Sequence, residues 1–87
     1  MRETVKDLKS DLLNTVDSTY AEHSDPNEEV LKESIKGVFI AGGYDYPDLQ
    51  DQIIKSVEFL FSEEQVPKKQ VVVKNIEAVI LSWRYDK

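Results

Sequence analysis

The chain of 87 residues contains no cysteine, a single histidine and no long apolar run. The absence of cysteine excludes disulfide bonds, thiolate nucleophiles and every zinc site that needs a cysteine ligand. The most apolar short segments, VFIA and AVIL, are far shorter than the ~20 residues that span a bilayer, and the charged N-terminal residues do not resemble a signal peptide. We therefore expect one soluble, cytoplasmic domain over residues 1–87.

Basic and acidic residues are unevenly distributed along the chain, whose formal net charge is −6. Residues 44–66 contain one basic and six acidic residues, whereas residues 67–87 contain five basic and two acidic residues. We expect either that these two segments attract each other or that the C-terminal one meets a different partner from the rest of the chain.

Apolar residues recur every three to four positions in the first three segments, which is the spacing that places them on one face of a helix. The first of these segments, TVKDLKSDLLNTVDSTYAEH, is expected to end at His23 and Ser24. The expected inward-facing residues are Val5, Leu8, Leu12, Val16 and Tyr20 in the first segment, Val30, Leu31, Ile35, Val38 and Phe39 in the second, and Leu49, Ile53, Val57, Leu60 and Phe61 in the third.

Turn-forming residues bound the second helix. Asp25 is expected to cap its start, with Pro26 at the first helical position and Glu28 reaching back as a capping box. Gly42 and Gly43 are expected to end it, because glycine adopts the left-handed conformation at the least steric cost.

The link to the third helix, within AGGYDYPDLQDQ, contains two tyrosines that a turn does not need. Pro47 is expected to begin the third helix, with Asp48 and Asp51 in the first turn, where the helix dipole favours anions. Tyr44 and Tyr46 are then expected either to cap the end of the core or to face a partner.

The last segment, PKKQVVVKNIEAVILSWRYDK, has two readings. The β-branched run Val71–Val73 favours a strand, but no second strand is evident to pair with it. However, Val72, Ile76 and Trp83, together with either Val79 or Ile80, keep the three-to-four-residue spacing of a helix. We predict a helix opened by Pro67. Four amphipathic helices with short connections predict an all-α fold, an antiparallel four-helix bundle with up-down topology.

Residues suited to an active site or a metal site are few. His23 is expected to interact with carbonyls at a helix end, and a catalytic triad cannot be argued from its neighbours in sequence. Asp45, Asp48 and Asp51 match no calcium-loop spacing. The glycine pair follows a helix and not a strand, which is the wrong context for cradling phosphate. We therefore expect no enzyme activity, no metal or other cofactor, and no small-molecule substrate.

Recognition of another protein is the function class that remains. A net charge of −6 lacks the cationic footprint of nucleic-acid binding, so no nucleic acid is expected. Aromatic residues and arginine are frequent interface anchors, and the candidates are Tyr44, Tyr46, Trp83, Arg84 and Tyr85. Trp83 continues the stripe of Ile76 and Ile80, which favours a core position, whereas Arg84 and Tyr85 fall off this stripe and are expected to be exposed.

The order of three segments, SDPNEEVLKESI, GGYDYPDLQDQIIKSVEFLF and EEQVPKKQVVVKNIEAVI, resembles the small immunity proteins that protect lactic-acid bacteria from their own class II bacteriocin, the enterocin A immunity family. The resemblance covers nearly the whole chain and rests on turn residues and segment lengths. It implies a cytosolic four-helix bundle that acts without catalysis. Such proteins recognise the bacteriocin-occupied membrane receptor, for the pediocin-like class the mannose phosphotransferase permease, and keep the pore shut.

The same resemblance implies where the partner binds, because the C-terminal half is associated in that family with the choice of bacteriocin. In this chain it points to Trp83, Arg84 and Tyr85 and to the basic face of Lys68, Lys69 and Lys74. The charge asymmetry is compatible with a cytosolic contact close to the membrane.

Two alternatives stay open. One is a small phage-type or plasmid-type regulator that binds a host protein. The other follows from NIEAVILSW, which is similar to the closing helix of DnaD-like replication domains and implies DNA binding. A salt-dependent mobility shift with DNA would discriminate the second alternative from the others.

Overall fold

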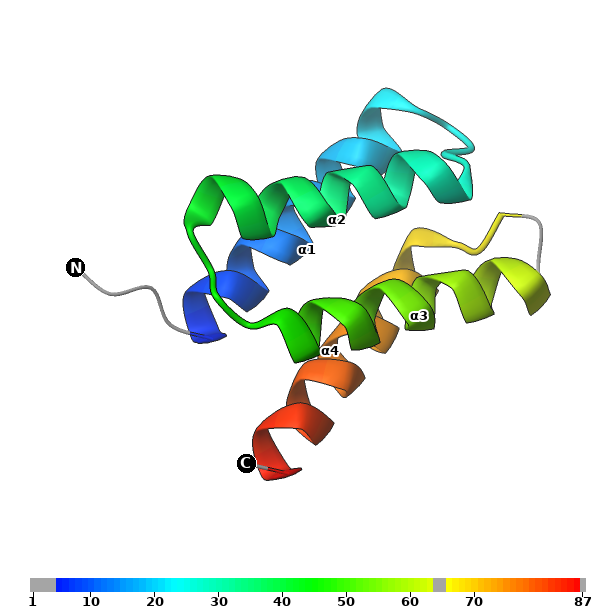
Figure 1. Cartoon of the computed structure of the whole chain (residues 1–87). Coiled ribbons are helices and arrows are strands. Elements are labelled where there is room, and N and C mark those ends of the chain that lie inside the picture. The colour runs from blue at the N-terminus through cyan, green and yellow to red at the C-terminus, as the bar shows by residue number, and fades with distance from the viewer. Residues whose placement is uncertain (1–4, 64–65, 87) are drawn as a thin grey trace.

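The computed structural model describes residues 5–63 and 66–86, with side chains as far as Trp83 (Figure 1). Within these residues the chain forms helices and no strand: α1 (Val5–Glu22), α2 (Glu28–Gly42), α3 (Pro47–Glu63) and α4 (Lys69–Asp86). The prediction of an all-α fold is confirmed, and Val71–Val73 lie within α4. None of the helices in the described ranges combines the length and the apolar content needed to cross a membrane.

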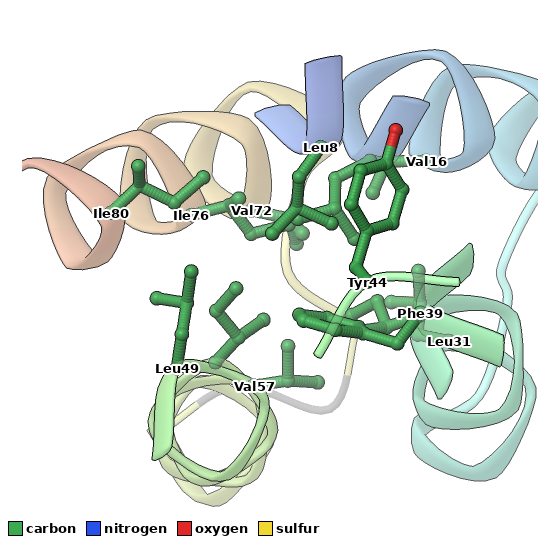
Figure 2. Packing of buried hydrophobic residues seen from close by; sticks show 13 residues of the cluster. Leu8, Val16, Leu31, Phe39, Tyr44, Leu49, Val57, Val72, Ile76 and Ile80 are labelled. Atoms are coloured by element: carbon green, nitrogen blue, oxygen red, sulfur yellow. The ribbon is translucent and has the colours of Figure 1, made fainter. Parts of the chain in front are cut away.

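The core lies between the four helices. Among the described residues, α1 packs against α2, α2 against α3, α3 against α4, and α4 against α1. Figure 2 shows side chains from all four helices pointing toward one another. The three-to-four-residue spacing of the sequence accounts for this, because it gives each helix one apolar face. The buried apolar cluster contains Leu8, Leu12, Val16, Leu31, Ile35, Phe39, Tyr44, Leu49, Ile53, Val57, Val72, Ile76 and Ile80.

The start of α2 differs from the sequence prediction. Asn27 and not Asp25 holds the cap position, with extended backbone and with its Oδ1 accepting a 2.8 Å hydrogen bond from the N–H of Val30. Pro26 is buried ahead of the helix and is not its first residue. Glu28 is the first helical residue, whereas a capping box needs its acid at the third. The predicted cap is therefore wrong by two residues, and asparagine replaces aspartate in an equivalent role.

The two glycines at the end of α2 have different roles. Gly43 has a φ of 68° and its N–H donates a 3.2 Å hydrogen bond to the carbonyl of Ile40, so the predicted glycine stop is confirmed. Gly42 lacks a positive φ, but a Cβ at this position would overlap the ring of Tyr44. One glycine makes the turn and the other leaves room for the tyrosine. Pro47 begins α3, as predicted.

Candidate partner-binding surface

Tyr44 lies in the core. It is 7% exposed, and Figure 2 shows its ring beside core residues while its hydroxyl points toward α1. The hydroxyl donates a 2.6 Å hydrogen bond to Oδ2 of Asp11. Of the two roles that the sequence left open for this residue, the structure corresponds to the end cap: Tyr44 packs into the core and attaches the link between α2 and α3 to α1.

Tyr46 attaches the same link to α4. Its ring centroid is 5.3 Å from that of Trp83, with an interplanar angle of 74°, which is an edge-to-face arrangement. Both residues are half-buried and pack against the core cluster. Trp83 therefore contributes to packing, as its place in the stripe of Ile76 and Ile80 indicates.

The three candidate lysines of the C-terminal segment have different surroundings. Lys69 makes an ion pair with Asp17 of α1. Lys68 and Lys74 are exposed, and within the part of the chain that the structure describes neither makes an ion pair. Lys68 and Lys74 are thus the two whose charge is available to a partner.

Arg84 and Tyr85 lie in the last turns of α4, but their side chains are outside the described residues. Each helical residue is rotated by about 100° from the one before, so these two positions leave the face on which Trp83 packs. Their contact with a partner stays a prediction.

A group of apolar residues lies outside the core on the outward side of α3 and α4. Leu81 is 55% exposed, Phe59 is 62% exposed and Val71 is 38% exposed. On α4, Val71, Lys74, Ala78 and Leu81 follow one another at spacings of three and four residues, and all four are exposed. This spacing places them on one side of the helix, opposite its buried stripe. We call these four residues, together with Phe59 of α3, the outer α4 surface.

Phe59 adjoins the α4 residues because of how α3 and α4 meet. The side-chain amide of Asn75 donates a hydrogen bond to the hydroxyl of Ser56. Phe59 follows Ser56 along α3, and Val71 precedes Asn75 along α4. Both therefore lie between this hydrogen bond and the connection that joins the two helices, on the same stretch of the interface.

Most of this surface was not predicted from the sequence, which indicated only Lys74 among its residues as a candidate for partner binding. A usable signal was present in the helical rotation: Leu81 stands five residues after Ile76 and is rotated from it by about 140°. Phe59 was harder to find, because it stands beside two further apolar residues in the run EFLF.

A separate polar cluster joins α2 to α3. Nζ of Lys32 lies 2.9 Å from Oε2 of Glu58 and 3.2 Å from Oε2 of Glu28. The hydrogen bonds to Glu58 and then to Glu28 raise the pKa of Lys32, because both favour its charged form. These three side chains satisfy one another, so their role is to hold α2 against α3.

The other described parts of the molecule show fewer features of a functional site. His23 is exposed after the end of α1. No group of three or more His, Cys, Asp or Glu side chains in the described residues is placed to hold a metal ion. A shallow hollow between α1 and α2 is lined by Asp11, Asn14, Thr15, Val38, Ala41 and Gly42.

Comparisons of the chain with models of protein families, with curated proteins and with solved structures found no match.

Proposed function

We propose that this chain acts by binding another protein, without catalysis, and that the outer α4 surface is the main contact. The observation that carries the proposal is the exposure of Leu81 and Phe59, at 55% and 62%, beside Lys74. Apolar surface of this kind, rimmed by polar residues, is typical of protein interaction sites. The helices already have their own buried faces, so folding does not require these two side chains to be apolar.

We also propose that the helices form an antiparallel, up-down bundle. Two ion pairs between α1 and α4 support this arrangement: Lys69 pairs with Asp17, and Nζ of Lys9 lies 3.9 Å from Oε2 of Glu77. From Lys69 to Glu77 the chain advances eight residues along α4, while from Asp17 to Lys9 it goes back eight along α1. Such a register is what two antiparallel helices produce.

The specific form that we propose is a cytoplasmic immunity protein of the class II bacteriocin type. Its partner would be the bacteriocin-occupied mannose phosphotransferase permease, which places the protein at the periphery of the membrane. The support is the resemblance in turns and segment lengths, together with the exposed apolar residues of α4, since the C-terminal half is the region that this family associates with the choice of bacteriocin. Arg84 and Tyr85 would extend the same contact.

The test is expression of the chain in a bacteriocin-sensitive lactic-acid bacterium, followed by challenge with a panel of class II bacteriocins. We expect survival against one bacteriocin or a few related ones. The Leu81→Ser variant, produced at the same level, should lose protection, whereas Ile40→Ser, which changes an apolar residue of α2 that is 79% exposed, should keep it. Growth inhibition of the wild-type strain by every bacteriocin in a broad panel would refute the immunity proposal.

A regulator that binds a host protein is the second candidate, and the same surface supports it. It predicts no protection in the survival assay, but a partner that is captured by the wild-type chain and lost with Leu81→Ser. A DnaD-like role predicts instead a mobility shift of DNA that weakens as salt rises. The net charge of −6 opposes this third possibility.

A further inference from the structure

We infer that the outer α4 surface docks an amphipathic helix of the partner whose apolar stripe is flanked by acidic residues. This inference rests on the proposed function and adds the chemistry of the partner segment. It follows from the length of the surface and from the charges around it.

The spacing on α4 matches a helical ligand. From Val71 to Leu81 the exposed stripe covers nearly three turns, or about 15 Å at 1.5 Å per residue. Phe59 of the neighbouring α3 lies on the same stretch of the interface as Val71, as the hydrogen bond between Asn75 and Ser56 indicates. A helix laid along this stripe would contribute its own apolar residues at spacings of three, four and seven, which is the usual pattern when one helix binds against others.

The charges select the chemistry of that helix. Lys74 lies in the middle of the stripe and Lys68 lies just before α4, and neither makes an ion pair within the described residues. Lys69 is paired with a carboxylate of α1, and the other lysines without an ion pair in the described residues, Lys6 and Lys36, lie on α1 and α2. A partner helix with Asp or Glu beside its apolar stripe would supply the missing opposite charge, which favours its selection over a neutral or basic helix.

The same charges argue against two other occupants. A second copy docking through its own α4 would add a second Lys68 and a second Lys74 to the interface, and the outer α4 surface has no carboxylate to offset them. An anionic lipid surface would meet a chain of net charge −6, with Asp48 and Asp51 exposed on the neighbouring α3. An acidic helix of another protein avoids the first conflict, and its acidic residues can pair with Lys74 within the stripe itself.

The experiment uses the full chain and two synthetic, side-chain-stapled helical peptides of about 18 residues, or five turns. Both peptides carry leucines at spacings of three and four, and they differ only in having glutamates or lysines beside the leucines. Binding is followed by heteronuclear NMR and by fluorescence anisotropy at low and high salt. Anionic vesicles of phosphatidylglycerol and sedimentation of the free chain report on the other two occupants.

We expect the glutamate peptide to bind at least about fivefold more tightly than the lysine peptide, with a preference that shrinks at high salt. Backbone shifts should concentrate at Phe59, Val71, Lys74, Ala78 and Leu81. Lys74→Glu should weaken the glutamate peptide and strengthen the lysine peptide, each by about fivefold, whereas Lys6→Glu, an exposed charge reversal on α1, should change neither. Leu81→Ala should weaken the glutamate peptide by about tenfold.

Equal binding of the two peptides, no binding of either, or shifts on another face would overturn this inference, as would vesicle binding or dimerisation through the outer α4 surface. Such a result would leave the proposed function standing if Leu81→Ser still abolishes protection or partner capture in cells. If the peptides discriminate as expected but Leu81→Ser is harmless in cells, the surface chemistry is right and the proposed function is wrong.

Discussion

The helices α1 and α4 are equally long, at 18 residues each, and differ in what lies on their outward sides. Each buries an apolar stripe, centred on Leu12 in α1 and on Ile76 in α4. Within Val5–Glu22 no large apolar side chain is exposed, and the outward residues are charged or small and polar apart from one alanine. The outward side of α4 carries Leu81 and Val71.

This difference separates residues that serve folding from residues that serve something else. The sequence of α1 is what an amphipathic helix packed against a core requires, with no large apolar residue left exposed. The same requirement accounts for the inward stripe of α4 but not for its outward side. We therefore expect substitutions in the buried stripes of α1 and α4 to change stability, and substitutions on the outer α4 surface to change binding.

The largest effects are expected in the core. Leu12→Ala and Ile76→Ala, at positions 0% and 1% exposed, should each lower the free energy of unfolding by about 2–5 kcal/mol in urea denaturation. Leu81→Ala should change it by less than about 0.5 kcal/mol. If an alanine variant is too unstable to measure, Ile76→Val should cost about 1 kcal/mol. A loss at Leu81 as large as the loss at Ile76 would remove the distinction between the two sides of α4.

A smaller effect is expected where the link between α2 and α3 attaches to α1. Tyr44→Phe removes the hydrogen bond to Asp11 and should lower the free energy of unfolding by about 1–2 kcal/mol. Tyr46→Phe keeps the ring that contacts Trp83 and should be close to neutral. Urea denaturation of the two variants compares their free energies of unfolding. Equal losses in both would show that Tyr44 is not an end cap bonded to α1.

Of the two cap candidates at the start of α2, only one should affect the stability of the chain when it is replaced by alanine. Asn27→Ala should cost about 1 kcal/mol of unfolding free energy, because it removes the acceptor for the N–H of Val30. Asp25→Ala should cost little, since Asp25 stands two residues before the cap. Thermal denaturation of both variants at one pH is sufficient, and the reverse order would restore the cap that the sequence suggested.

The smallest effects concern alkaline pH. Burial raises the pKa of Tyr20, whose hydroxyl donates a 2.6 Å hydrogen bond to the carbonyl of Pro67. Hydrogen bonds raise the pKa of Lys32. In both cases the folded chain holds the proton more tightly than the unfolded chain, so these contributions are complete below the ordinary values of 10.0 and 10.5 and are lost as pH rises through the higher folded pKa.

The chain should therefore lose stability over the interval above about pH 10. Tyr20→Phe and Lys32→Gln, although less stable at neutral pH, should each lose less over that interval than the wild type. Melting temperatures measured across the interval make the test. A pH dependence identical in the wild type and both variants would show that neither group contributes to it.

The fold class was accessible to sequence reasoning because periodicity and turn residues are local signals. The stripe through Val72, Ile76 and Ile80 correctly outweighed the β-branching of Val71–Val73. The cap was missed because Asp25 and Asn27 flank the same proline and have similar cap propensity. Packing decides between them: Pro26 is buried ahead of the helix, so the helix begins after Asn27 and not after Asp25.

The candidate site was less accessible, because burial of an aromatic residue depends on how helices meet. Tyr44 and Tyr46 look alike in the sequence, yet one is bonded to α1 and the other contacts α4. The exposure of Phe59 depends on which side of α3 faces α4, and no local pattern specifies this. Leu81 is the exception, because its rotation from the buried stripe is readable from spacing alone.

One variant, measured in two ways, tests whether the outer α4 surface serves binding and not folding. Leu81→Ser should leave the free energy of unfolding within about 0.5 kcal/mol of the wild type and should abolish protection, or partner capture, in the strain where the wild type shows it. Ile40→Ser serves as the matched control and should change neither. A Leu81→Ser protein that unfolds easily, or that is as protective as the wild type, would contradict the claim that the outer α4 surface exists for binding and not for folding.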